Sequence, residues 1–152
     1  MNRGELQRSE ILAIIGGLII AVGLFLTWYH LQNKNVTVNS TTGPADLSGW
    51  DVHTIIRWLL LAAAAAPLIL AWIILRGHAL SWPRGEMTAV TAVAALGLIA
   101  YVTFINKPGD VTSLVSLRIG VFVSLAGAAL MLFGSATRAS KTERPRKPPG
   151  VM

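Results

Sequence analysis

Four long apolar runs are the feature that most limits what this chain can fold into. Each is long enough to cross the ~30 Å hydrocarbon layer of a membrane, which takes about 20 helical residues. A helix inside a soluble protein is seldom apolar on every face over that length. The runs therefore predict an all-α fold over residues 1–137, an antiparallel bundle of four transmembrane helices with short loops. The expected helices are about 9–30, 49–76, 86–106 and 111–136.

The composition agrees with a membrane protein. Hydrophobic residues make up 53% of the chain and charged residues only 13%, whereas a soluble domain has about 25% charged residues. The chain has no cysteine, which excludes a disulfide framework, a thiolate zinc site and a thiol nucleophile.

The basic residues are divided unevenly between the two ends of the predicted bundle. Nine belong to the termini and the connection between the second and third helices, and four belong to the other end. Because Lys and Arg gather on the cytoplasmic side, both termini are expected in the cytoplasm, with the helices in a bacterial plasma membrane. The nine are Arg3, Arg8, Arg76, Arg84, Arg138, Lys141, Arg144, Arg146 and Lys147, and the four are Lys34, Arg57, Lys107 and Arg118.

The end of the chain, residues 138–152, carries five of these basic residues together with three prolines. Such a segment cannot bury a core and is expected to be a disordered tail. Its charges favour contact with anionic lipid. Nucleic-acid binding is not expected, since the tail has neither aromatic side chains nor a folded patch.

The start of the second predicted helix holds the main candidate for a binding site. Ser48 with Asp51 three residues later fits a capping box, and Trp50, His53 and Arg57 would then share one helix face. With Arg118 from the fourth helix, Trp50, Asp51, His53 and Arg57 are candidates for binding a lipid headgroup or another ligand at the outer membrane surface. The favoured alternative is structural: both arginines lie near helix ends, where they can snorkel to the interface and pair with Asp46, Asp51 or Asp110.

Two chemical arrangements can be drawn from the polar residues on this side. His30, Asp46, Asp51 and His53 have the right donor types for zinc, but their spacing matches no known zinc motif. Ser48, His53 and Asp51 suggest a catalytic triad, yet the serine is better explained as a helix cap and no strand–turn–helix elbow presents it. The sequence therefore predicts no metal, no cofactor and no catalytic residue.

Small residues recur at helical spacing on the first and fourth helices. Such stripes let neighbouring helices approach closely, and a seven-residue repeat is typical of a tightly packed left-handed crossing. Packing within one chain is the favoured interpretation, and a homo-oligomer interface is the alternative. The residues are Ala13, Gly17 and Ala21 on the first helix, and Gly120, Ser124, Gly127 and Gly134 on the fourth.

Three further features have a local meaning. Trp28 and Tyr29 are expected to form an aromatic belt at the membrane interface. Val36-Thr37-Val38 is the only alternating fragment of the long loop, so at most a short strand is expected there. Pro67, near the middle of the second helix, removes a backbone donor and predicts a kink.

The order of aromatic residues resembles a group of small bacterial membrane proteins. Leu26-Thr27-Trp28-Tyr29 ends the first helix, and Ser48-Gly49-Trp50 opens the second after a polar loop. This order resembles small four-helix integral membrane proteins of actinobacteria and related bacteria, although those usually have proline where Thr27 stands. The resemblance implies membership of a group with no established activity. Claudin-like four-helix proteins have a similar topology, but the chain lacks their paired cysteines and no extracellular sheet is expected.

Three functions follow as hypotheses. The first is a non-enzymatic membrane protein that acts by helix packing, as an accessory subunit or a small homo-oligomer, with lipids and another membrane protein or itself as partners. The second is a module that binds a lipid or quinone headgroup in the outer leaflet. The third is an enzyme of lipid or cell-wall chemistry, for which no nucleophile–base geometry is signalled.

Overall fold

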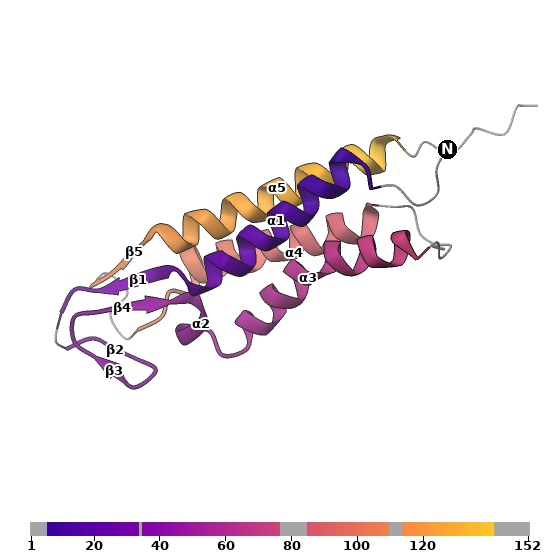
Figure 1. Cartoon of the computed structure of the whole chain (residues 1–152). Coiled ribbons are helices and arrows are strands. Elements are labelled where there is room, and N and C mark those ends of the chain that lie inside the picture. Colours follow the sequence, from indigo (N-terminus) through magenta and orange to yellow (C-terminus); the bar gives the residue numbers. More distant parts are fainter. Residues whose placement is uncertain (1–5, 34, 77–84, 110–113, 142–152) are drawn as a thin grey trace, which may run out of the picture.

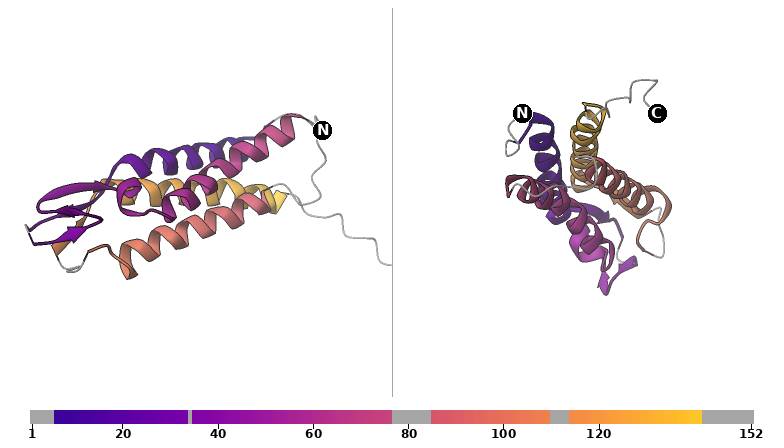
Figure 2. Two further views of the ribbon diagram at one scale, coloured as in Figure 1. Left: turned by 90° about the horizontal axis from the view of Figure 1, so that it is seen from below. Right: turned by 90° about the vertical axis from the view of Figure 1, so that its right-hand side faces the viewer.

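The computed structural model describes residues 6–33, 35–76, 85–109 and 114–141. Four of its helices are long and apolar enough to cross a membrane, as the apolar runs predict. They lie side by side in a bundle (Figure 1), and each contacts two neighbours in the order α1, α5, α4 and α3 (Figure 2). They are α1 (Arg8–Phe25), α3 (Ile56–Leu75), α4 (Glu86–Ala100) continued by the π-helical turn η1 (Tyr101–Ile105), and α5 (Ile119–Lys141).

The prediction of an all-α fold with short loops is wrong in one respect, because strands cover one end of the bundle (Figure 1). In the larger sheet, β1 pairs with a strand on each side. One of these strands belongs to the long connection between α1 and α2 (Gly49–Val52), and the other belongs to the connection before α5. The three-stranded antiparallel sheet has the order β4 (Ala45–Ser48), β1 (Thr27–Leu31) and β5 (Val115–Leu117). A two-stranded hairpin, β2 (Thr37–Val38) and β3 (Thr41–Thr42), lies beside it. This end of the molecule is called the sheet end below.

The strands confirm one expectation and correct two others. The short strand expected within Val36-Thr37-Val38 is present as β2. One of the two grounds for setting aside a claudin-like topology, the missing sheet, no longer holds, although the paired cysteines are still absent. The helix α1 ends at Phe25 rather than near residue 30, because Thr27–Leu31 finds strand partners on both sides.

The second predicted helix, 49–76, is divided in two. A four-residue helix α2 (Gly49–Val52) is followed by a break, and α3 begins only at Ile56. The fourth predicted helix, 111–136, instead starts at Ile119, because Val115–Leu117 is a strand. It continues to Lys141 and so enters the segment expected to be disordered; residues 142–152 lie outside the described chain.

Pro67 lies inside α3, and the helix changes direction part-way along its length (Figure 1). A proline in a helix interior removes one hydrogen bond and crowds the preceding turn, which accounts for the bend. The same proline ring faces α1, where a Cβ at Gly17 would lie 3.0 Å from it and 2.5 Å from the Ala64 carbonyl. Gly17 therefore allows α1 to cross the bend of α3 closely.

The last two glycines of the α5 repeat face α1. A Cβ added to Gly127 would lie 2.9 Å from the carbonyl oxygen of Gly16, and one added to Gly134 would lie 2.6 Å from the carbonyl of Ser9. Real Cβ atoms do not approach backbone atoms this closely, so these positions require glycine. Ser124, about one turn before Gly127, is fully buried against Gly23 of α1.

The three small residues expected to form one stripe on α1 face different neighbours. Ala13 packs against Gly134 of α5, Gly17 against α3, and Ala21 is partly buried at the core. Gly16 and Gly23, which were not singled out, make the closest approach to α5. Their spacing of seven residues matches the repeat on α5, and this match was the signal that could have identified them.

Candidate functional site

Trp28 is the side chain on which the sheet end is assembled. Between Thr27 and Tyr29 the pairing of β1 with β4 skips one residue, so Trp28 lies in a bulge. A bulge interrupts the alternation of a strand, and this is why Trp28 and Tyr29 can both be fully buried although they are adjacent. Because both side chains are fully buried, they do not form the aromatic belt expected at the membrane interface.

The Trp28 indole joins three helices. Its Nε1–H donates to the carbonyl oxygen of Gly23 near the end of α1 (2.7 Å). A Cβ on Gly49, at the start of α2, would lie 2.6 Å from the indole, and one on Gly120, at the start of α5, would lie 2.5 Å from it. These two glycines let α2 and α5 begin in direct contact with the ring.

Tyr29, which is fully buried, and His53, which is half-buried, form a hydrogen-bonded pair beside the indole of Trp28. The Tyr29 hydroxyl lies 3.1 Å from His53 Nε2 and 3.1 Å from the carbonyl oxygen of Val102. A hydroxyl has one proton and a carbonyl can only accept, so Tyr29 donates to Val102 and accepts from the Nε2–H of His53. Burial lowers the pKa of His53 to about 4 and raises the pKa of Tyr29, so both are neutral at pH 7.

The π-helical turn at the end of α4 makes this contact possible. The N–H of Asn106 donates to the carbonyl of Tyr101, five residues back (2.8 Å). In an α-helix the same N–H would use the carbonyl of Val102. The wider turn thus frees the Val102 carbonyl to accept the hydrogen bond from Tyr29.

Arg57, at the start of α3, is held between aromatic rings. Its guanidinium carbon lies 5.0 Å from the centroid of the Trp50 ring and 5.7 Å from that of Trp58, distances at which cation–π attraction operates. One terminal nitrogen donates to the carbonyl of Trp50 (3.1 Å). The Nε atom is buried and has no hydrogen-bond partner. Phe25 stacks on Trp50 with ring centroids 5.1 Å apart.

Arg57 also lines an open groove at the sheet end, called the Arg57 groove, of about 550 Å³. Residues of the β2–β3 hairpin and β4 border it together with α2 and the start of α3. The hairpin is fixed there by Asn39, whose side-chain amide donates to the carbonyls of Val52 (2.7 Å) and Asp51 (3.2 Å). The lining residues are Val38, Asn39, Thr41, Ala45, Asp46, Leu47, Trp50, Asp51, Val52 and Arg57.

No carboxylate neutralises Arg57 within the part of the chain that the structure describes. Salt bridges within 4.0 Å are confined there to His30 and Asp46. Asp51 instead accepts a hydrogen bond from the hydroxyl of Ser48 (2.6 Å), and this hydroxyl also accepts from the Asp51 N–H as the cap of α2. The expected pairing of Arg57 with Asp46 or Asp51 is thus absent, and Asp110 lies outside the described residues.

The predicted site residues separate into two groups. Trp50, Asp51 and Arg57 meet at the groove. His53 does not, because the helix break at residues 53–55 turns its ring toward Tyr29. Arg118 is exposed between β5 and α5, where its backbone N–H donates to the carbonyl of Trp28 (2.8 Å), and it does not line the groove.

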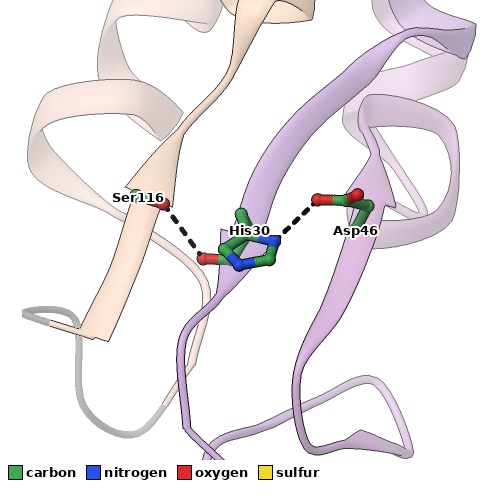
Figure 3. Close-up of polar contacts among 3 residues, drawn as sticks. All are labelled: His30, Asp46 and Ser116. Carbon is green, nitrogen blue, oxygen red and sulfur yellow. Dashed lines mark hydrogen bonds and ion pairs between the residues drawn. The ribbon is translucent and has the colours of Figure 1, made fainter.

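Three polar residues form a row across the sheet (Figure 3). His30 of β1 pairs with Asp46 of β4 on one side and Ser116 of β5 on the other. The His30 Nδ1 atom lies 2.7 Å from the Asp46 carboxylate. The Ser116 hydroxyl, however, donates to the backbone oxygen of His30 (3.4 Å) and not to its ring. This row joins the strands, and the Ser116 hydroxyl and the His30 ring do not form the hydrogen-bonded pair of a nucleophile and its base.

The residues considered for a metal do not converge. Asp46 pairs with His30 on the sheet, Asp51 accepts a hydrogen bond from Ser48, and His53 faces Tyr29. Over residues 6–33, 35–76, 85–109 and 114–141, no group of three His, Asp or Glu side chains is placed to hold a metal ion. Ser48, considered as a nucleophile, is the cap of α2 and bonds to Asp51.

A second pocket lies at the opposite end of the bundle. It is bordered by Ser9 and Glu10 of α1, Thr88 of α4 and Ser135 of α5, and its volume is about 10 Å³. That space accommodates about one water molecule. The Arg57 groove is thus the better candidate for a ligand.

Comparison with known proteins adds no assignment. No model of a protein family, no curated protein and no solved structure matches the chain.

Proposed function

We propose that this chain is a non-enzymatic, multi-pass protein of the plasma membrane that binds a phospholipid headgroup in the Arg57 groove. The observation that supports it is the state of Arg57. Its guanidinium is held between Trp50 and Trp58, lines an open groove and has no carboxylate partner among the described residues. A cation in that state stabilises a bound phosphate, and the planar guanidinium can bind two phosphate oxygens at once.

The position of Arg57 along α3 favours a lipid as the source of the phosphate. Arg57 is the second residue of a 20-residue apolar helix, so it stands where hydrocarbon gives way to headgroups. Trp58 and Phe25, both largely exposed, lie beside the groove. Tryptophan at this depth is typical of membrane interfaces. A lipid with its phosphate on Arg57 can rest its chains on the apolar surface below.

The test is native mass spectrometry of phospholipid retained by purified protein. We expect Arg57→Gln to lower the retained lipid about tenfold, the size of one lost charge-assisted hydrogen bond. Arg57→Lys keeps the charge but loses the planar fork, so an intermediate loss is expected. The matched control is Arg76→Gln at the other end of α3, where the guanidinium lies over Trp72 at 4.2 Å. Equal occupancy in all four proteins would leave Arg57 as a snorkelling anchor and refute the proposal.

The orientation has its own test. The division of basic residues supports cytoplasmic termini and an outward-facing sheet end. Because the chain has no cysteine, single-cysteine variants at Asn35 and Ser140 report cleanly. A membrane-impermeant thiol reagent applied to intact cells should label Asn35→Cys and spare Ser140→Cys. The opposite pattern would place the groove in the inner leaflet.

The packing hypothesis stays as a second candidate, an accessory subunit or small homo-oligomer. The glycines of α1 and α5 are occupied within the chain, but α4 exposes Ala94 and Gly97, and nothing lies within 4 Å of a Cβ placed on Gly97. Small residues on an outward helix face favour the approach of another helix. Gly97→Leu should then reduce the mass of the complex isolated in mild detergent, and an unchanged mass would assign this face to lipid.

A further inference from the structure

The Arg57 groove contains two carboxylates as well as its guanidinium. Asp46 and Asp51 both line it, and neither comes within 4.0 Å of Arg57. Each has one oxygen engaged, Asp46 with His30 and Asp51 with the hydroxyl of Ser48. The second oxygen of each carboxylate has no hydrogen-bond partner in the described chain. The groove thus offers positive and negative charges that do not neutralise one another.

We infer that the headgroup bound in this groove is zwitterionic, with its phosphate on Arg57 and a primary ammonium group on Asp46 and Asp51. The inference rests on the proposed function and names its ligand class. A headgroup with negative charge alone would gain Arg57 but face both carboxylates, and such like-charge contacts are strongly unfavourable. A headgroup with both charges bridges the groove, because its ammonium group can donate hydrogen bonds to the carboxylate oxygens that have no partner.

The aromatic contacts favour a primary over a quaternary ammonium. Quaternary ammonium groups are recognised by the open faces of aromatic rings. The ring of Trp50 is already contacted by Phe25 at 5.1 Å, by Trp58 at 5.2 Å and by the Arg57 guanidinium at 5.0 Å. A primary ammonium has N–H donors for charge-assisted hydrogen bonds to carboxylates, and a quaternary one has none. The ligand class is therefore a phospholipid with a primary ammonium headgroup, such as phosphatidylethanolamine.

The test is a competition among three lipids with the same acyl chains. Full-length protein is exposed to equal amounts of phosphatidylethanolamine, phosphatidylglycerol and phosphatidylcholine, and native mass spectrometry reports which is retained. Phosphatidylethanolamine should exceed each of the others about tenfold, as expected for a charge-assisted hydrogen bond. The double variant Asp46→Asn, Asp51→Asn should bring the three lipids to near-equal retention while total lipid stays bound. Glu86→Gln, an exposed carboxylate at the other end of the bundle, should leave the preference unchanged.

The outcomes separate this inference from the proposed function. If the wild type retains phosphatidylglycerol as well as phosphatidylethanolamine, and Arg57→Gln releases both, the zwitterionic assignment is wrong and headgroup binding stands. If Arg57→Gln retains every lipid as the wild type does, headgroup binding itself is wrong. Unchanged thermal unfolding of the double variant excludes misfolding as the cause of a lost preference. Displacement of lipid by soluble phosphoethanolamine at matched concentration would overturn the assignment to a membrane lipid.

Discussion

Along the bundle, α1 and α5 meet backbone to backbone, whereas at the sheet end the elements are joined by large side chains. Gly16 of α1 and Gly127 of α5 let the two helix backbones come into direct contact. At the sheet end, Trp28 separates the start of α5 from the end of α1, and hydrogen bonds from Trp28 and Tyr29 reach α1 and η1.

The difference explains where a ligand site can form. Backbone contact leaves almost no space, and the pocket at the glycine-packed far end holds about 10 Å³. Large side chains and a hairpin hold the helix ends apart at the sheet end and leave a groove of about 550 Å³. We expect substitutions in the two regions to act differently, and the following predictions test this from the largest effect to the smallest.

Trp28→Ala should have the largest effect. It removes a fully buried indole, its hydrogen bond to Gly23 and the surface on which Gly49 and Gly120 rest. Replacing a buried aromatic residue by alanine costs about 3–5 kcal/mol of the free energy of unfolding. Thermal unfolding in detergent measures the loss, and hydrogen exchange should rise first in β1, β4 and β5. Trp72→Ala, which removes an exposed tryptophan, is the control and should change stability by less than about 0.5 kcal/mol.

Gly127→Leu should act on the bundle instead. A side chain there meets Gly16 and Ile20 of α1 at distances that no rotamer relieves, and overpacking of this kind costs about 1–3 kcal/mol. Ala126→Leu, at the neighbouring and exposed position of α5, is the matched control. Hydrogen exchange should rise along α1 and α5 and leave the sheet protected. Equal unfolding temperatures for the two variants would contradict close packing of α1 on α5.

Sequence patterns predict the bundle well for a physical reason. A membrane requires about 20 apolar residues for each crossing, so each of the four candidate spans can be recognised from the composition of its own segment. The glycine repeat of α5 is equally local, since its seven-residue period follows from helix geometry. Gly16 and Gly23 were missed because three small residues at a spacing of four, beginning at Ala13, gave the more regular stripe.

The sheet end is harder to predict because its structure depends on partners far apart in sequence. Thr27–Leu31 continues an apolar run and becomes a strand only because Ala45–Ser48 and Val115–Leu117 pair with it. For the same reason the helix break after Val52 was not foreseen, and His53 was placed on the face of Arg57. Arg57 and Trp50 were placed together correctly, because the two remain in contact across the break.

Tyr29→Phe removes a single oxygen from the sheet end. The carbonyl of Val102 and the Nε2–H of His53 would both lose their partner. Leaving buried polar groups unpaired costs about 1–3 kcal/mol. Tyr101→Phe makes the same substitution at an exposed position and should hardly change the free energy of unfolding. If both variants unfold at the wild-type temperature, the hydroxyl of Tyr29 makes no net contribution and the link from β1 to η1 is not a stabilising one.

At neutral pH the smallest effect is that of His53, which makes the stability of the sheet end depend on pH. Burial lowers the pKa of this imidazole from 6.5 to about 4, so between these values the unfolded chain binds a proton that the folded chain does not. Stability is then complete above pH 6.5 and falls as the pH drops toward 4. The expected slope is about 1.4 kcal/mol for each pH unit at most.

Thermal unfolding between pH 7 and pH 5 measures this slope. His53→Gln keeps an N–H donor for Tyr29 but cannot be protonated, so its unfolding temperature should fall less over the same range. His30→Gln removes the half-buried imidazole paired with Asp46. Because His53 is intact in this variant, the part of the pH dependence of its unfolding temperature that comes from His53 should be the same as in the wild type. A slope in His53→Gln equal to that of the wild type would mean that His53 is as accessible to protons in the folded protein as in the unfolded chain. The contact of His53 with Tyr29 would then make no contribution to the pH dependence of stability.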